Sequence, residues 1–299
     1  MRFVDAHFHL WDLDRYAYPW MTDPHKRLAG DTAPQHKSYC VGDFLEDARG
    51  LELVGAVHVQ AGIDVRNNID ETAWLEAIAE DRALSRGLPD AVIAYADLAS
   101  PALSSELEAQ CRHVRVRGVR QMLNQAGRYP DLYPNLLRDP AWCAGLTQIE
   151  RHGLSFDLQI YPSQVSDAVQ VIRSRPGITF IVDHAGLPPL QSPELTGQWR
   201  DGLALLAALP NTVLKISGFG MFDRQWTIER VRPFVERAVD LFSPSRCLFG
   251  SNFPLERLAR SYASLWADYA VLIGAYAPAE RAAMFEGNAR RVYRLSESR

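Results

Sequence analysis

One pattern recurs along the whole chain: a short apolar run that ends in one or two polar residues, followed by a longer stretch rich in alanine and leucine. Nearly continuous apolar runs of this length are typical of parallel strands that are buried on both faces. The longer stretches have the spacing of amphipathic helices, for example at 70–86, 163–174 and 228–241. This alternation predicts βα units, which build parallel sheets.

The apolar runs number eight, and we expect strands at 2–9, 53–60, 91–98, 116–122, 155–160, 179–184, 212–217 and 247–252. Eight βα units in one chain predict an α/β fold of the closed (β/α)8 type, a TIM barrel. The alternative is an open doubly wound sheet, which normally has a glycine-rich phosphate turn after its first strand; this chain has none there. Because no composition shift marks a boundary, we expect a single domain over residues 1–299.

Two long segments lack a periodic pattern. Residues 12–39 are rich in proline, histidine and aromatic residues, and residues 124–139 contain prolines, tyrosines and asparagines. Long loops in compact domains are uncommon unless they are functional, so we expect both segments to lie over the barrel mouth. Four aromatic residues at the first loop either stack on a ligand or pack within the loop: Trp11, Tyr16, Tyr18 and Trp20.

Composition and charge exclude several classes of protein. The chain is 47% hydrophobic and 23% charged, which is ordinary for a globular protein. Its net charge of -4 offers no basic field for nucleic acid or anionic lipid. Its four cysteines are scattered without a Cys-x-x-Cys pair, which argues against a disulfide framework or a zinc ribbon. The start of the chain lacks an apolar signal region, and the longest apolar run is too short to span a membrane, so we expect a soluble, cytoplasmic protein.

The first predicted strand carries two histidines near its end. Since side chains alternate along a strand, His7 and His9 are expected to share a face with Asp5, with Ala6 and Phe8 on the other face. Two imidazoles at the end of a barrel strand form one half of a metal or proton-transfer site. In the alternative interpretation, one histidine packs in the core and the other lies in a loop.

Polar side chains recur at the ends of the later predicted strands, where the catalytic groups of this fold converge on one mouth. The candidates are His58, Gln60, Asp97, Arg120, Asp157, Gln159, His184, Lys215, Ser217 and Asn252. Asp183 alternates with His184, so only one of the two can face inward, and we expect it to be His184. Arg120 either forms an ion pair with a loop carboxylate or binds a substrate carboxylate or lactone oxygen. Asp97 is expected to be a helix N-cap or a structural acceptor.

Six segments together resemble the amidohydrolase superfamily, in particular the TIM-barrel metal-dependent hydrolases called amidohydrolase family 2. In chain order they are DAHFHLWD at 5–12, GVRQ at 118–121, VDHAGLP at 182–188, LKISG at 214–218, RCLFGSNFP at 246–254 and GNARRVY at 287–293. Within the family, the pattern is most similar to the lactonases of sugar acids and dicarboxylates, which include fuconolactonases, rhamnonolactonases and 2-pyrone-4,6-dicarboxylate lactonases.

The resemblance implies that His7, His9 and His184 line the site. They are either ligands of one divalent metal ion, Zn²⁺ or Mn²⁺, or substrate-binding and catalytic groups, since some lactonases of this group work without a metal. It also implies a catalytic role for position 252, where relatives carry a water-activating aspartate and this chain has Asn252. An amide cannot take a proton from water at pH 7 and binds a cation more weakly. Besides a metal hydroxide, the remaining candidates for the general base are Glu256, His58 and His184.

We therefore expect an enzyme, a hydrolase that opens a lactone of a sugar acid or small dicarboxylate by attack of an activated water on the carbonyl. The residues expected to bind substrate are His58, Gln60, Arg120, Gln159 and Lys215, with Arg120 or Lys215 balancing negative charge. The alternatives are a non-oxidative decarboxylase of an unsaturated or aromatic acid, and a barrel that binds a sugar acid without catalysis. The expected partners are small-molecule lactones or carboxylates, with no nucleic acid and no membrane, and the sequence is compatible with a homo-oligomer.

Overall fold

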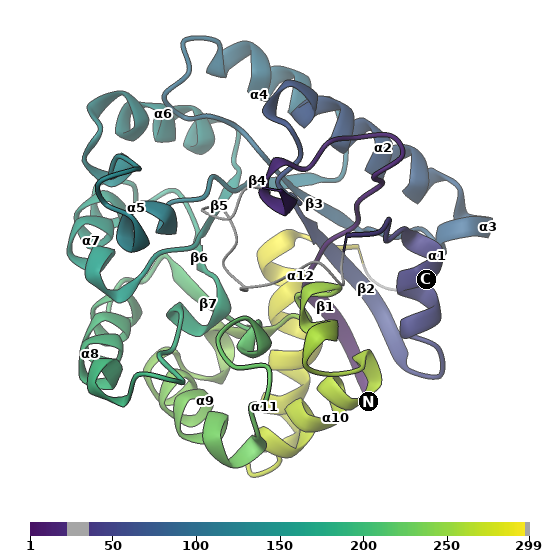
Figure 1. Cartoon of the computed structure of the whole chain (residues 1–299), viewed down its shortest axis with the longest axis vertical. Helices are drawn as coiled ribbons and strands as arrows, with labels where there is room; N and C mark the ends of the chain where they lie inside the picture. Colours follow the sequence, from purple (N-terminus) through teal and green to yellow (C-terminus); the bar gives the residue numbers. More distant parts are fainter. Residues whose placement is uncertain (23–35, 297–299) are drawn as a thin grey trace.

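In the computed structural model, which describes residues 1–22 and 36–296, the eight apolar runs form one parallel sheet with the strand order β1 to β8. The strands are β1 Arg2–Phe8, β2 Glu52–Val59, β3 Ala91–Ala94, β4 Val116–Val119, β5 Ser155–Leu158, β6 Phe180–Val182, β7 Thr212–Ile216 and β8 Cys247–Phe249. Each strand pairs with its successor in the chain, as consecutive βα units require. The predicted (β/α)8 barrel is confirmed (Figure 1).

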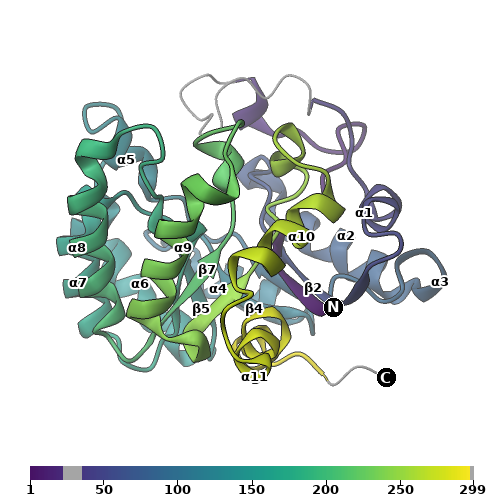
Figure 2. The same ribbon diagram turned by 90° about the horizontal axis from the view of Figure 1, so that it is seen from below.

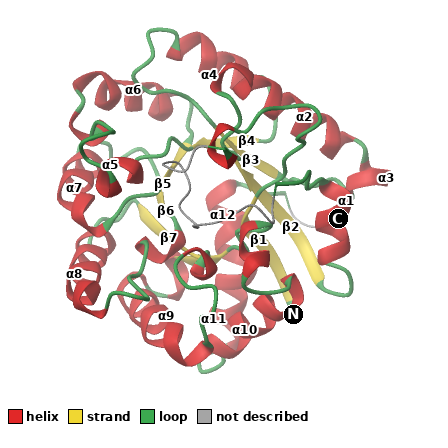
Figure 3. Ribbon diagram, viewed as in Figure 1, coloured by secondary structure: helices red, strands yellow, loops and turns green. Residues whose placement is uncertain are grey.

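Helices surround the strands on the outside, except α12 (Asn288–Tyr293), which lies in the middle of the ring in this view (Figure 3). They are α1 Val41–Asp47, α2 Asn68–Glu80, α3 Arg82–Ser85, α4 Leu103–Cys111, α5 Asn124–Arg128, α6 Pro140–Arg151, α7 Val165–Arg173, α8 Thr196–Ala207, α9 Ile228–Phe242, α10 Tyr262–Leu272, α11 Pro278–Ala282 and α12 Asn288–Tyr293. The longest, α9, buries Val231, Val235, Ala238, Val239 and Phe242. These residues recur every three or four positions, so one apolar stripe faces the core while the opposite side faces solvent.

The barrel interior holds its own apolar cluster. Its members are Val4, Ala6, Val57, Val59, Ala91, Ile93, Ile181, Val213, Leu248, Ala289 and Tyr293. The strands contribute alternate residues, which is the layered filling expected of a barrel of this size. The last two members come from α12, which lies in the middle of the ring in Figure 1. Figure 2 shows α11 at one end of the barrel, which leaves the opposite end for the loops that follow the strands.

The ring closes between β1 and the segment that follows β8. The N–H of His9 donates a hydrogen bond to the carbonyl of Phe253 at 2.8 Å, and the N–H of Asn252 donates to the carbonyl of His7 at 2.6 Å. Gly250 permits this close approach, since a Cβ there would lie 2.6 Å from the Cβ of His7. The two ends of the chain therefore build one wall of the barrel mouth.

Strand β1 does not alternate regularly, and this corrects one prediction. Its register with β2 shifts between Phe3 and Val4 and again between Asp5 and Phe8. Val4 and Ala6 fill the barrel interior, so Asp5 points outward, where the hydroxyl of Tyr262 donates to it at 2.9 Å. Within the second irregular stretch, His7 points inward, towards Lys215 and Asp183. The prediction that Asp5 and His7 share a face was wrong, because the irregularity changes which positions face the barrel.

The strands end one to four residues before the predicted ends. Several polar residues that were expected within strands therefore lie in the loops that follow them. His184 has φ of 51° and Asn252 has φ of 56°, both in the left-handed region that L-residues rarely adopt. Strand alternation does not govern which way such side chains point.

The first of the two predicted mouth loops is described only in part, because residues 23–35 lie outside the described residues. Its described part includes a short helical turn, η1 (Pro19–Met21). The second contains α5 and another such turn, η5 (Leu136–Arg138). In the described ranges, the helices are all too short or too polar to cross a membrane.

Candidate active site

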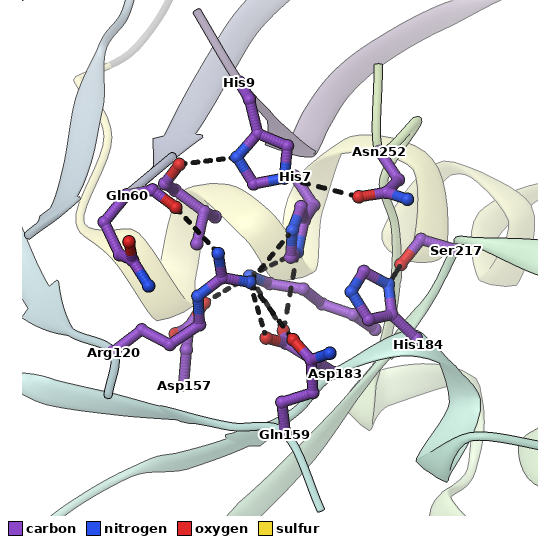
Figure 4. Close-up of polar contacts among 12 residues, drawn as sticks. His7, His9, Gln60, Arg120, Asp157, Gln159, Asp183, His184, Ser217 and Asn252 are labelled. Carbon is purple, nitrogen blue, oxygen red and sulfur yellow. Dashed lines mark hydrogen bonds and ion pairs between the residues drawn. The ribbon is translucent and has the colours of Figure 1, made fainter. Parts of the chain in front are cut away.

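A cavity of about 500 Å³ opens at the carboxyl ends of the strands. Six of the nine residues predicted to form the site line it: His9, Gln60, Arg120, Gln159, His184 and Asn252. They come from the ends of β1, β2, β4, β5, β6 and β8. Residues far apart in the sequence therefore meet at one mouth, where the active sites of this fold lie (Figure 4).

His9 presents an unprotonated nitrogen at the cavity wall. Its Nδ1 lies 2.7 Å from the carbonyl oxygen of Val59; this oxygen can only accept, so Nδ1 carries the proton of the neutral ring. Its Nε2 lies 3.3 Å from Oδ1 of Asn252, which is also an acceptor, so this contact is not a hydrogen bond while the ring is neutral. Burial lowers the pKa of His9 well below its usual value, and the nearby Arg120 and His58 lower it further. At neutral pH, Nε2 of His9 can therefore take a proton from water.

His184 follows β6 and lines the cavity mouth. It begins a left-handed turn, η7 (His184–Gly186), and its Nδ1 lies 2.9 Å from the hydroxyl oxygen of Ser217. This contact fixes the ring and leaves Nε2 available to a ligand. Burial lowers the pKa of His184 to about 3, so this ring is also neutral at pH 7.

A network of charged side chains lies beneath the cavity (Figure 4). Nζ of Lys215 contacts Oδ2 of Asp157 and lies 3.3 Å from Oδ1 of Asp183. Nη1 of Arg120 lies 3.5 Å from Oδ2 of Asp183. Burial raises the pKa of Asp157. Burial acts in the same direction on Asp183, but Lys215 and His7 outweigh it and hold the pKa of Asp183 well below its usual value.

His7 belongs to this network and does not reach the cavity. Its Nδ1 lies 3.4 Å from Nζ of Lys215 and 3.5 Å from Oδ1 of Asp183, and its Nε2 lies 3.5 Å from Nη1 of Arg120. Burial lowers its pKa well below the usual value, and Lys215 contributes to this shift. The ring centroid of His7 is 5.0 Å from that of His9 and 4.6 Å from that of His184. The three predicted imidazoles therefore lie together, with His7 behind the other two.

Two residues predicted to bind substrate lie elsewhere. His58 does not line the cavity among the described residues. Its neighbours Val57 and Val59 fill the barrel interior, so His58 points away from the interior and packs edge-on against Phe8. Lys215 is fully buried within the charged network and is likewise absent from the described lining. Neither residue is part of the described cavity wall.

Glu256 is not placed to be the general base. Its buried carboxylate accepts hydrogen bonds from the N–H of Gly220, at 2.9 and 3.0 Å, and from Nε1 of Trp226 at 2.9 Å. It thereby braces the loop after β7. Asp97 is a structural acceptor, as expected, with its Oδ1 accepting from the N–H of Ala99 at 3.1 Å.

Asp183 is the site residue that the sequence interpretation missed. We expected only one of Asp183 and His184 to face inward, and this was wrong because β6 ends at Val182 and the backbone then turns left-handed. The sequence did contain a signal that pointed to Asp183. Cations predicted at other strand ends, such as Arg120 and Lys215, need a carboxylate partner when they are buried.

Some aromatic residues of the first loop face the cavity, where a ligand could stack on them, and others pack against the protein. Trp11 and Trp20 line the cavity, and Nε1 of Trp20 is fixed by the carbonyl of Ala61 at 2.7 Å. Tyr16 packs edge-on against Trp74. One wall of the cavity is therefore aromatic, facing the polar strand ends.

One group of side chains could hold a divalent metal ion. Among the described residues, His7, Asp183 and His184 bring ligand atoms within 4.8 Å of one another. Imidazole nitrogens with a carboxylate suit Zn²⁺ and similar ions. The group shares two histidines with the predicted ligand set but has Asp183 in place of His9.

Two protein cations already contact these ligand atoms. Lys215 lies beside His7 and Asp183, and Arg120 lies beside both as well. A divalent ion bound there would come close to two positive charges. The donors fit a metal ion, and the neighbouring cations weaken its binding.

Comparison with known proteins identifies the family. The family model described as amidohydrolase matches residues 4–295. The chain belongs to the amidohydrolase family. An uncharacterised protein of Sinorhizobium fredii is 36% identical to this amidohydrolase over 98% of both chains. An L-fucono-1,5-lactonase of Burkholderia multivorans is 28% identical, with 98% of this chain and 96% of the relative covered.

A solved structure supports the same assignment. The crystal structure of an amidohydrolase from Burkholderia multivorans with bound zinc has a TM-score of 0.82 and 27% identity, and covers 99% of this chain and 100% of that one. The family and these relatives together show that this amidohydrolase is a hydrolase.

Proposed function

We propose that this amidohydrolase hydrolyses a lactone of a sugar acid or a small dicarboxylate. The observation that carries the proposal is Nε2 of His9, an unprotonated base on a cavity wall that also offers Arg120, His184 and amide donors. The aromatic wall with Trp20 is suited to pack against a sugar ring. The L-fucono-1,5-lactonase relative supports this substrate class.

The proposed step begins with water. Its oxygen bonds to the lactone carbonyl carbon while Nε2 of His9 takes the proton, and Oδ1 of Asn252, 3.3 Å away, accepts a hydrogen bond from the N–H so formed. Arg120 and His184 stabilise the negative oxygen of the tetrahedral intermediate. The ring C–O bond then breaks, and His9 returns its proton to the leaving alkoxide. The product is a hydroxy acid, which ionises and releases one proton.

A pH-indicator assay with a panel of aldonolactones and pyrone-type lactones tests the proposal. We expect acid release from at least one lactone at a rate well above its spontaneous opening. Opening of no lactone, with or without added zinc or manganese, would refute it. Release of carbon dioxide from an unsaturated or aromatic acid without acid production would support the decarboxylase alternative instead.

Metal removal should have a small effect. A divalent ion held by His7, Asp183 and His184 would lower the pKa of a bound water and polarise a carbonyl. Because His9 supplies a base without it, we expect treatment with a chelator to change kcat/KM by less than about threefold. Elemental analysis before and after treatment gives the metal content. A large loss of activity that zinc restores would contradict the assignment of His9.

Gly218 tests whether the His184 ring must keep its position. Its φ is 73°, and a Cβ there would lie 2.7 Å from Nδ1 of His184. We expect Gly218→Ala to displace the ring from Ser217 and to lower kcat/KM by about tenfold or more. Gly153 is the matched control, since its φ is 62° but a Cβ there meets nothing within 4 Å. Gly153→Ala should cost stability in urea unfolding and leave kcat/KM unchanged; equal activity losses in both variants would exclude a specific effect on His184.

A further inference from the structure

The charged groups at the cavity already have partners. Among the described lining residues, the side chains charged at neutral pH are Arg120 and Asp64. Arg120 faces Asp183 at 3.5 Å, and Asp64 is paired with Arg66, with Nη2 to Oδ2 at 2.6 Å. The second buried cation, Lys215, faces two carboxylates beneath the cavity and does not line it. The described wall therefore holds no spare positive charge.

Two buried amides supply neutral donors instead. Gln60 and Gln159 line the cavity, and each is only 2% exposed. Their carbonyl ends are used internally: Oε1 of Gln60 accepts from the N–H of Gly62 at 2.7 Å, and Oε1 of Gln159 accepts from Nη1 of Arg120 at 3.3 Å. Within the described part of the chain, neither Nε2 has a hydrogen-bond partner. Each amide therefore presents N–H groups to a ligand.

Arg120 already faces the Asp183 carboxylate, so beyond the oxygen at the reacting carbonyl it offers no charge to a further anion. Its Nη2 donates to the carbonyl of Gln60 at 2.7 Å, its Nη1 faces Gln159, Asp183 and His7, and its Nε is buried. In the proposed reaction this guanidinium balances the charge that develops on the carbonyl oxygen. Among the described lining residues, no further cation would face a carboxylate elsewhere on the substrate, and burying an unpaired ion costs several kcal/mol.

We propose that Gln60 and Gln159 are specificity-determining residues that select an uncharged, polyhydroxylated lactone, and that the cavity discriminates against lactones bearing a free carboxylate. This inference rests on the proposed lactone hydrolysis and narrows it to one of the two substrate classes. Hydroxyl oxygens accept hydrogen bonds from the two amides, whose N–H groups lose their water on binding and need such partners.

Matched pairs of lactones test the charge preference. D-Glucono-1,4-lactone and D-glucaro-1,4-lactone have the same ring and differ only in a terminal CH₂OH or carboxylate, and galacto and manno pairs extend the comparison. For each pair that reacts, we expect kcat/KM of the neutral member to exceed that of the charged member by at least about thirtyfold. For pairs that do not react, inhibition constants against whichever lactone is hydrolysed give the same ratio.

The outcomes separate this inference from the proposed function. Equal or better use of the charged members overturns the charge preference while lactone hydrolysis stands. Hydrolysis of no lactone at all overturns the proposed function, and the inference with it.

A substitution tests the role of the amides. We expect Gln60→Leu to raise KM for the neutral lactone by about tenfold with kcat changed less than about threefold, since it removes donors used in binding. Gln121 is the control, because it lines the cavity but its Oε1 accepts from Trp142 at 2.8 Å and its Nε2 donates to Asp97 at 3.1 Å. Gln121→Leu should lower stability without this selective rise in KM. An unchanged KM in Gln60→Leu, or the same rise in both variants, would overturn the assigned role.

Discussion

Replacing His9 with glutamine is expected to lower kcat for lactone opening by about a thousandfold, because a positioned general base contributes factors of this size. Glutamine has a similar reach and can still donate to the carbonyl of Val59, which now accepts from Nδ1 at 2.7 Å. It cannot take a proton from water at neutral pH. Steady-state kinetics at pH 7.5 measure the loss, which should fall on kcat far more than on KM.

His58 provides the matched control for this substitution. It is also a fully buried histidine, its ring centroid lies 6.2 Å from that of His9, and it does not line the described cavity wall. His58→Gln should change kcat by less than about threefold, with any cost appearing in urea unfolding. A comparable loss of kcat in the two variants would show that His9 acts through packing and not as the base.

The pH dependence of the wild-type enzyme gives a separate check on His9. A base works in its unprotonated form, so activity falls as the pH drops through its pKa. Burial and Arg120 lower the pKa of His9 well below the usual 6.5, which moves this fall to more acidic pH. We expect kcat/KM to stay level from pH 8 to about pH 5.5, measured with a lactone that is stable in this range. Half-loss of activity between pH 6.5 and 7 would assign the base to another group.

The barrel was predictable because it depends on a pattern that is local in the sequence. Each apolar run has the length of a buried strand, and each stretch between runs can cover it with a helix. Once eight such units are recognised, the carboxyl ends must meet at one mouth, so His9, Arg120 and His184 could be placed together without coordinates.

The orientation of individual side chains could not be predicted in the same way. It depends on contacts between segments that are distant in the chain, such as the approach of Gly250 to His7. The register shift in β1 turns Asp5 outward, and the left-handed turn after β6 lets Asp183 and His184 both serve the site. Period-two alternation assumes a regular strand and fails where the strand is irregular or has ended.

Asp183→Asn is expected to have the largest effect on stability, about 3 kcal/mol in the free energy of unfolding from urea titration. The substitution removes a carboxylate that lies within 3.5 Å of both Lys215 and Arg120, and leaves these buried cations to share Asp157. Activity should fall as well, since Arg120 loses the group that holds its charge in place.

The pH range in which Asp183→Asn lowers the free energy of unfolding follows from the direction in which folding shifts the pKa of Asp183. The pKa of Asp183 is lowered on folding, so its ionised form stabilises the protein above the unfolded pKa, and this contribution is lost as the pH falls through the lower folded value. The difference in the free energy of unfolding between wild type and Asp183→Asn should therefore be the same at pH 7 and pH 5. It should shrink below about pH 4.

Asp5→Asn is the control for Asp183→Asn. It also removes a buried carboxylate, but one that has no cation as a partner among the described residues. Asp5 is also fully buried, but its partners are neutral: the N–H groups of His7 and Ser251 at 3.1 and 2.8 Å, and the hydroxyl of Tyr262 at 2.9 Å. Burial raises its pKa to about 6, and an asparagine can keep one oxygen towards the N–H groups while its amide donates to the tyrosine. Its substitution should cost about 1 kcal/mol. If the two variants lose equal stability, cations do not determine the energetics of Asp183, and the buried network is held together by hydrogen bonding and packing alone.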